Sequence, residues 1–299
     1  MSELFRALAA LAEPPNETTP RLAGALSLGP PPRDDEYTEI FLFQLYPYAS
    51  VYLGAEGMRG GEARDRVAGF WRALGRVPPN EPDHLAVMLA LYARLREFEE
   101  GEPDEQRRGG WRHARRAFLW EHLLSWLPVY LSKLKDLSQP DEDDPRFYAR
   151  WAELLARALD EEAGALGPQG TLPAHLREAP PLADPRRAGT DEFLRTLLAP
   201  ARAGFVLTRA DLRRAARRLE LNTRPGERHF VLKSLFAQDA AGLLGWLKRE
   251  ADSAAEQHRA RRPALGAVAE AWETRAAASA ALLSELRQTA GEAGAEGSD

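Results

Sequence analysis

The chain has 299 residues, of which 44% are hydrophobic, a formal net charge of -5 and no cysteine. The absence of cysteine excludes disulfides, thiolate nucleophiles, iron–sulfur ligation and cysteine zinc sites, so any metal site would need histidine and carboxylate ligands. The hydrophobic content is sufficient for a buried core in one large domain or two smaller ones. The acidic balance argues against broad binding to a phosphate backbone.

The first fifteen residues, MSELFRALAALAEPP, predict a short helix after Ser2. They lack the basic start of a secretory signal, and Arg6 interrupts their apolar run. The longest apolar runs of the whole chain are far below the length of a membrane span. We therefore expect a cytoplasmic protein without stable membrane insertion.

Helical periodicity dominates the chain, and no comparable series of alternating strands appears. Apolar residues recur at helical spacing in residues 67–74, 147–158 and 212–219. The proline-rich span from 167 to 185 is the strongest break. The sequence predicts an all-α protein with four parts: a helical or irregular segment (1–32), a helical core (33–166), a C-terminal helical extension (167–287) and a disordered tail (288–299).

The segment LYPYASVYLG, residues 45–54, places Tyr46, Tyr48 and Tyr52 around Pro47. Two interpretations stay open, namely core aromatics at an irregular corner and the wall of a peptide-binding groove. The following GAEGMRGG is glycine-rich, but no strand precedes it and no Lys-Ser/Thr pair follows it. It is therefore predicted to be a loop and not a phosphate-binding motif.

The segment NEPDHLAVML, residues 80–89, is typical of a helix start. Pro82 suits a first helical turn, Asn80 or Glu81 could cap it, and Asp83 would meet the helix N-terminus. Consecutive helical side chains point about 100° apart, so Asp83 and His84 make a poor catalytic pair. No second histidine follows one turn later, as a zinc-binding helix requires. A structural helix start and a surface site both stay open.

In AFLWEHLLSWLPVYL, residues 117–131, almost every position is apolar, which predicts a helix buried on most sides. Pro128 should end or kink this helix and open the next segment. His122 on this helix is predicted to be a hydrogen-bonded core histidine and not a ligand. Just before it, Arg115 and Arg116 give the local pattern of a twin-arginine signal, but in mid-chain and inside a predicted helix, which indicates a chance match.

Residues 201–233 carry nine Arg or Lys against three acids, and Thr208 and Asp211 predict a capping box. The intervening LNTRPGER is longer than the turn of a helix-turn-helix, and aromatic residues are sparse. A solvated basic face or a surface for an acidic partner is favoured, and a nucleic-acid-binding or regulatory module is the alternative function. No nucleophile elbow, phosphate loop or zinc helix is present, so we predict no enzyme, catalytic residue, metal or cofactor.

Four short motifs in this order resemble the TorD/DmsD/NarJ-like family of redox-enzyme maturation chaperones. They are Pro47-Tyr48-Ala49-Ser50-Val51-Tyr52-Leu53-Gly54, Phe70-Trp71 with Gly75, Glu81-Pro82-Asp83-His84-Leu85, and Phe118, His122-Leu123, Trp126 and Pro128. The resemblance covers about residues 33–160. Ala49 departs from it, because an acidic residue often stands at this place in the family.

The resemblance implies a TorD-like helical bundle, here with a C-terminal helical extension. It also implies a cytoplasmic chaperone that binds an apo molybdoenzyme catalytic subunit or its twin-arginine leader peptide. The chaperone would hold this client until the molybdopterin cofactor is inserted, before assembly or export. No nucleic-acid partner is expected, and a homodimer formed by helix exchange is left open.

Leader arginines require carboxylates, for which Glu81, Asp83, Glu121 and the acidic run from Glu97 to Glu105 are candidates. The apolar part of a leader requires an aromatic groove. The resemblance places the E-P-D-H segment beside this groove. The predicted client-binding residues are Tyr48, Tyr52, Phe70, Trp71, Glu81, Pro82, Asp83, His84, Glu121, His122 and Trp126.

Overall fold

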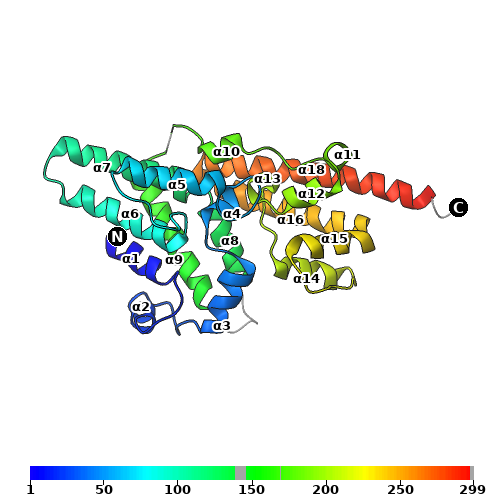
Figure 1. Cartoon of the computed structure of the whole chain (residues 1–299), viewed down its shortest axis with the longest axis horizontal. Coiled ribbons are helices and arrows are strands. Elements are labelled where there is room, and N and C mark those ends of the chain that lie inside the picture. The colour runs from blue at the N-terminus through cyan, green and yellow to red at the C-terminus, as the bar shows by residue number, and fades with distance from the viewer. Residues whose placement is uncertain (139–145, 169, 297–299) are drawn as a thin grey trace. The chain divides into compact units, whose positions relative to one another are not determined.

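A computed structural model describes residues 1–138, 146–168 and 170–296 and divides the chain into two compact units. Unit 1 comprises Met1–Val51 and Arg59–His175, and unit 2 comprises Tyr52–Met58 and Leu176–Asp299. Helices form both units, and over the described ranges the only extended pairing is one antiparallel bridge between Tyr48 and His84 (Figure 1). The prediction of an all-α fold is confirmed.

Unit 1 consists mainly of helices that follow one another along the chain. They are α1 (Ser2–Ala10), α2 (Thr19–Ala25), α3 (Asp34–Tyr37), the π-helix η1 (Thr38–Gln44), α4 (Ala49–Leu53), α5 (Gly61–Ala73), α6 (Leu85–Gly101), α7 (Glu105–Phe118), the π-helix η2 (Leu119–Leu123), α8 (Leu127–Leu137) and α9 (Phe147–Leu166). The last residues of α4 belong to unit 2, and α10 (Ala174–Glu178) crosses the boundary at residue 175.

Large aromatic side chains fill the core of unit 1. Trp151 of α9 is fully buried and donates its indole N–H to the carbonyl of Leu8 at 3.2 Å. Phe5 meets the ring of Tyr92 edge-on at 4.8 Å between centroids. These contacts attach α1 to both α6 and α9, and each buried aromatic contributes roughly 2–3 kcal/mol through the hydrophobic effect.

The apolar segment 117–131 is buried as predicted, but it is not one helix. It contains the end of α7, the π-turns of η2 and the start of α8, where Pro128 occupies the first turn. Proline is favoured there because the amide it lacks would have no partner within the helix. The prediction that Pro128 opens the next segment is confirmed.

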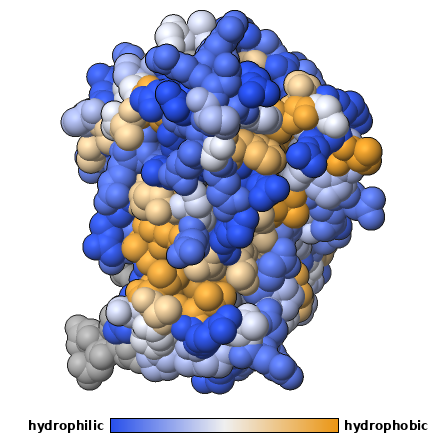
Figure 2. Space-filling model, turned by 90° about the vertical axis from the view of Figure 1, so that its left-hand side faces the viewer, coloured by the Kyte–Doolittle hydropathy of each residue, from blue (hydrophilic) through white to orange (hydrophobic). Residues whose placement is uncertain are grey.

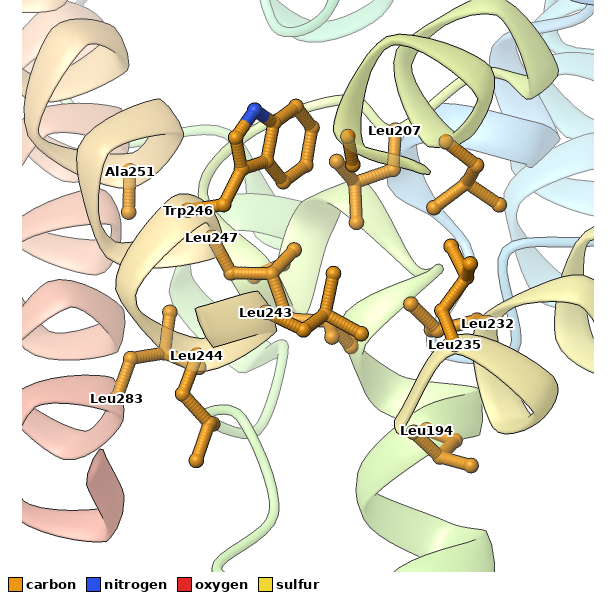
Figure 3. Close-up of a cluster of buried hydrophobic side chains, with 14 of the residues drawn as sticks. Leu194, Leu207, Leu232, Leu235, Leu243, Leu244, Trp246, Leu247, Ala251 and Leu283 are labelled. Atoms are coloured by element: carbon orange, nitrogen blue, oxygen red, sulfur yellow. The ribbon is translucent and has the colours of Figure 1, made fainter. Parts of the chain in front are cut away.

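Unit 2 consists of Tyr52–Met58, which contains the end of α4, and the C-terminal helices. These are α11 (Pro185–Ala188), α12 (Thr190–Leu197), α13 (Pro200–Ala203), α14 (Arg209–Arg218), α15 (Arg228–Gln238), α16 (Ala240–Ala260), α17 (Arg262–Leu265) and α18 (Ala267–Glu296). Leucines of α12, α15, α16 and α18 point into one core together with Leu207 and Trp246 (Figure 3). Both hydrogen bonds of the predicted Thr208–Asp211 capping box are present.

α18 continues into the segment predicted to be a disordered tail. It runs to Glu296, and residues 297–299 lie outside the described part of the chain. The tail prediction is therefore corrected as far as Glu296. Alanine and glutamate are strong helix formers, so a helix stabilised by packing earlier in its length can continue past its last core residue.

The surface is largely polar. Figure 2 shows one face of the molecule on which hydrophilic side chains dominate and hydrophobic ones gather in patches. Among the described residues, no helix combines the length and the apolarity needed to cross a membrane.

Candidate functional site

The E-P-D-H segment does not begin a helix where the sequence predicts one. α6 begins only at Leu85, with His84 at its N-cap, and residues 81–83 form a turn. The prediction that Asn80 or Glu81 caps a helix starting at Pro82 is wrong. The backbone pairs elsewhere instead: Leu85 donates to the carbonyl of Pro47 at 2.8 Å, and Ala49 donates to the carbonyl of Asp83 at 3.0 Å.

This pairing joins two of the four motifs that are more than thirty positions apart in the sequence. Asp83 is 2% exposed, and its Oδ2 accepts the N–H of Ser50 at 3.1 Å. Ser50 Oγ in turn accepts the N–H of Gly60 at 3.0 Å. The Asp83 carboxylate therefore holds the first turn of α4 in place, which satisfies a buried backbone donor.

Tyr48 and Glu81 lie on the solvent side of this pairing. Tyr48 donates its hydroxyl to Glu81 Oε2 at 2.9 Å, and the Arg59 guanidinium lies 5.1 Å from the centre of the Tyr48 ring. Arg59 and Glu81 approach to 3.8 Å, and their side chains are 61% and 56% exposed. Burial and then the Glu81 carboxylate raise the pKa of Tyr48, while Arg59 opposes this change. These three residues are called the Tyr48 cluster below.

His84 lies behind the Tyr48 cluster. Its ring meets the ring of Tyr48 edge-on at 4.9 Å, and its Nδ1 is 3.6 Å from Glu13 Oε1. Burial lowers the pKa of His84, although the carboxylates of Glu13, Glu81 and Asp83 oppose this change. His84 is therefore neutral near pH 7, so it can support the Tyr48 ring but contributes no charge.

A second group of predicted residues lies around α5 and η2. Phe70 contacts Phe118 at 4.8 Å and His122 at 5.4 Å between ring centres. Burial lowers the pKa of His122 to about 3, with smaller contributions from His175 and Arg66. His122 lies in the core as predicted, but its Nδ1 has no hydrogen-bond partner among the described residues. Glu121 Oε1 accepts the N–H of Ala174 at 2.9 Å.

The predicted residues therefore differ in their access to solvent. Glu81 is exposed and Tyr48, Phe70, Trp71 and Glu121 are half-buried, whereas Tyr52, Pro82, Asp83, His84, His122 and Trp126 are buried. The indole N–H of Trp126 donates to the carbonyl of His122 at 2.8 Å. The buried members shape the interior behind the site, and the accessible members are the ones that can meet a partner in this conformation.

The acidic run from Glu97 to Glu105 is largely occupied by arginines of the same unit. Glu97 pairs with Arg6 and Arg94, Glu99 with Arg112 and Arg115, Glu100 with Arg96, and Glu102 with Arg107. Asp104 caps α7 by accepting the N–H of Arg107. Most carboxylates of this run therefore have arginine partners in this structure, and their use by leader arginines stays a prediction.

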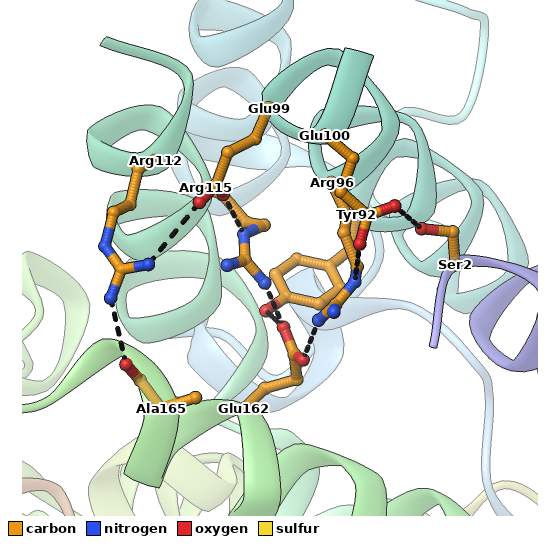
Figure 4. A network of polar contacts seen from close by, with 9 residues as sticks. All are labelled: Ser2, Tyr92, Arg96, Glu99, Glu100, Arg112, Arg115, Glu162 and Ala165. Atoms are coloured by element: carbon orange, nitrogen blue, oxygen red, sulfur yellow. Dashed lines mark hydrogen bonds and ion pairs between the residues drawn. The ribbon is translucent and has the colours of Figure 1, made fainter. Parts of the chain in front are cut away.

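One arginine of the run Arg115-Arg116 belongs to a buried ionic network (Figure 4). Glu162 of α9 is 2% exposed, and its carboxylate accepts hydrogen bonds from Tyr92, Arg96 and Arg115. Arg115 also donates to Glu99 at 2.7 Å. The Glu162 carboxylate thus ties α6 and α7 to α9. This role gives Arg115 a structural function inside the fold, which agrees with a chance match to an export signal.

Several residues near the motifs were not anticipated. Arg59 and Glu13 lie outside every motif, and Glu13 is brought to His84 only by the fold. Leu42 and Phe43 in η1 are 49% and 46% exposed, and Val77 is 89% exposed. Leu42 and Phe43 lie in a π-helix just before the P-Y-A-S motif, and π-helical turns often occur at functional sites.

No group of three or more His, Asp or Glu side chains within the described residues is arranged to hold a metal ion. Cavities in unit 2 are lined by residues outside the four motifs, and one of them is described below.

Comparison with known proteins finds similarity over the part of the chain that contains the motifs. Residues 9–132 match the family model described as nitrate reductase delta subunit. Over 124 residues the chain is 31% identical to the chaperone protein TorD of Photobacterium profundum, covering 40% of this chain and 55% of that protein. Over 101 residues it is 34% identical to the chaperone protein TorD of Vibrio vulnificus, covering 31% and 45%. No solved structure matches.

The matched part of the chain is similar to the TorD-like maturation chaperones. It contains all four motifs and ends inside α8, so α9 and nearly all of unit 2 lie outside it. The chain spans about half the length of the curated relatives it matches. The comparisons do not support the alternative of a nucleic-acid-binding module.

Proposed function

We propose that the protein is a cytoplasmic chaperone that binds an apo molybdoenzyme subunit, its twin-arginine leader peptide, or both. It would hold the client until the molybdopterin cofactor is inserted, before assembly or export. The similarity of residues 9–132 to this family supports this class of function. The pairing of the P-Y-A-S and E-P-D-H segments, which leaves Tyr48 and Glu81 accessible, is the observation from which we propose the binding site.

The chemistry of the Tyr48 cluster suits a guanidinium ligand. Glu81 offers a carboxylate, and Tyr48 offers the face of an aromatic ring. Arginine binds carboxylates through two parallel hydrogen bonds and also stacks on aromatic rings. In the unbound protein the Arg59 side chain takes both positions, at 3.8 Å from Glu81 and 5.1 Å from the Tyr48 ring centre.

Arg59 therefore acts as a stand-in for a client arginine. Its ion pair with Glu81 is long and solvent-exposed, and such a pair contributes only about 0–1 kcal/mol. A client arginine could displace Arg59 at small cost. The half-buried Phe70 and Trp71 are proposed to contact the apolar part of the client, while Asp83 and His84 hold the cluster from behind.

The experiment has two stages. Affinity purification from the native cell with mass spectrometry identifies the client, and its leader peptide and apo subunit are then titrated against purified variants. Glu81→Gln should weaken binding about two- to fivefold, and Arg59→Gln should strengthen it by a similar factor because the competing guanidinium is gone. Glu161→Gln, which removes the same charge from an exposed position on α9, is the matched control.

The opposite directions of the first two variants are the decisive feature of this test. If Arg59→Gln weakened binding as much as Glu81→Gln, the Tyr48 cluster would be a structural element and not a guanidinium site. If no molybdoenzyme subunit were recovered with the protein, the proposed class of client would be abandoned.

A further inference from the structure

A cavity of about 260 Å³ lies in unit 2, where the loop after α14 returns to α15. Arg209 and Arg213 of α14 line it together with Thr223 and Arg224 of the loop. Leu212 and Val231 supply an apolar wall. The cavity is thus lined by three arginines and one threonine beside a small hydrophobic surface, and no acidic side chain of the described residues lines it.

The three arginines are not neutralised within the described part of the chain. No ion pair or side-chain hydrogen bond joins Arg209, Arg213 or Arg224 to another described residue. Arg214 on the same helix behaves differently, because it pairs with Asp211 at 2.7 Å and with Glu250 at 3.3 Å. Three like charges around one cavity repel each other, and an anion bound among them would relieve that repulsion.

The loop that completes the cavity is held at both ends. Asn222 donates its N–H to Gln238 Oε1 at 2.9 Å, and Gln238 Nε2 donates back to the carbonyl of Asn222 at 2.9 Å. Arg228 donates to the carbonyl of Leu207 at 2.8 Å. A preformed cavity of this kind binds a ligand without the entropic cost of ordering a loop.

The positive charge of the cavity comes from side chains and not from free backbone donors. The Thr208–Asp211 capping box occupies the N–H groups of Thr208 and Asp211 at the start of α14. Recognition of an anion therefore rests on the guanidinium groups, whose planar donors match the oxygens of a phosphoryl group in pairs. The Thr223 hydroxyl adds a donor that a diffuse basic surface would lack.

We propose that this cavity binds the phosphoryl group of a small molecule, with Arg209, Arg213 and Arg224 as its ligands. The volume is slightly below the range of about 300–1,000 Å³ that is usual for drug-sized ligands, which favours a small phosphomonoester. An apolar part of that molecule lies against Leu212 and Val231. The site belongs to the part of the chain outside the family match and is independent of the Tyr48 cluster.

Calorimetric titration of the full chain with inorganic phosphate and with phenyl phosphate tests the proposal. The ionic strength is kept at about 0.15 M with chloride, because the screening length of about 8 Å then suppresses long-range attraction. Saturable binding of one equivalent is expected. The double variant Arg213→Gln, Arg224→Gln should weaken it by about tenfold or more.

The matched control is Arg217→Gln, Arg218→Gln, which removes the same charge from exposed positions on α14 that do not line the cavity. This variant should bind phosphate within about twofold of the unmodified protein. Equal weakening by both double variants would mean a diffuse basic face and would overturn the site. Failure of the unmodified protein to bind either probe would overturn it as well. Circular dichroism of each variant verifies that the helices are intact.

Discussion

The Asp83 carboxylate accepts the backbone N–H of Ser50 at 3.1 Å and so attaches the E-P-D-H segment to the start of α4. The acid that looks like a ligand for a client arginine is thus committed to the fold, and Glu81, two positions earlier, is the accessible carboxylate. The two motifs are therefore joined, with Asp83 stabilising the start of α4 and Glu81 exposed to solvent.

Replacing Asp83 by alanine should lower the free energy of unfolding by about 1–3 kcal/mol, because the buried Ser50 N–H loses its acceptor. Asp83→Asn retains an acceptor oxygen and should cost less. Urea denaturation followed by circular dichroism measures both. Equal costs for the two variants would indicate that the negative charge, and not the hydrogen bond, is what stabilises this turn.

Glu162→Gln should be strongly destabilising, by about 3–5 kcal/mol, because it leaves the buried guanidinium of Arg115 short of negative charge. Glu153→Gln on the same helix is the control. Glu153 pairs with Lys135 at 3.3 Å on an exposed surface, and such pairs contribute at most about 1 kcal/mol. Similar unfolding midpoints for both variants would contradict the assigned role of the network.

The buried His122 should make stability depend on pH. Its pKa is about 3 in the folded protein against an ordinary value of 6.5, so the unfolded chain takes up the proton first as the pH falls. The contribution of the neutral ring to the free energy of unfolding is therefore complete above about pH 6.5. Between this pH and pH 3 it falls by about 1.4 kcal/mol per pH unit.

His122→Asn should therefore reduce the slope of unfolding free energy against pH over this window. His258→Asn offers a comparison in unit 2, where burial lowers the pKa to about 4 and the corresponding window ends sooner. Urea denaturation at a series of pH values gives the slopes. An unchanged slope in His122→Asn would mean that the ring is protonated or accessible in the folded protein.

Gly57→Ala should destabilise unit 2. Gly57 has φ +62, and an added Cβ would lie 2.8 Å from the carbonyl oxygen of Leu198 and 2.9 Å from Cα of Ala199. Gly61→Ala is the control, because Gly61 has φ +66 but nothing within 4 Å of its Cβ position. The control should cost about 1–2 kcal/mol from backbone strain alone, and Gly57→Ala should cost more. Thermal unfolding that ranks the two variants in reverse would contradict the close approach of this loop to residues 198–199.

The helical class could be predicted because it depends on local periodicity. The stripe Leu212, Ala215 and Ala216 is buried as expected, and the Thr208–Asp211 capping box is formed, since both features involve residues within one or two turns. Pro128 lies in the first turn of α8 for the same reason. The division into units could not be foreseen, because residues 52–58 belong to unit 2 although their neighbours in sequence belong to unit 1. Gly57 packs against residues 198–199, which are distant in sequence.

The candidate site was predicted only as a list of residues. The residue types suggested that acidic side chains bind client arginines and that aromatic ones contact apolar client side chains. The structure divides these residues by burial: Asp83, His122 and Trp126 are buried, whereas Tyr48 and Glu81 are accessible. Arg59 and Glu13 could not be anticipated, because only the fold brings them to Tyr48 and His84.

The sequence by itself determined the helical class, the helix stops and the family-like order of motifs, because these are properties of neighbouring residues and of composition. The tertiary structure determined which partner each charged side chain has. It joined the P-Y-A-S and E-P-D-H segments, paired the acidic run with arginines, and left Arg209, Arg213 and Arg224 around an open cavity. Such pairings depend on the approach of residues distant along the chain, and spacing in the sequence does not specify that approach.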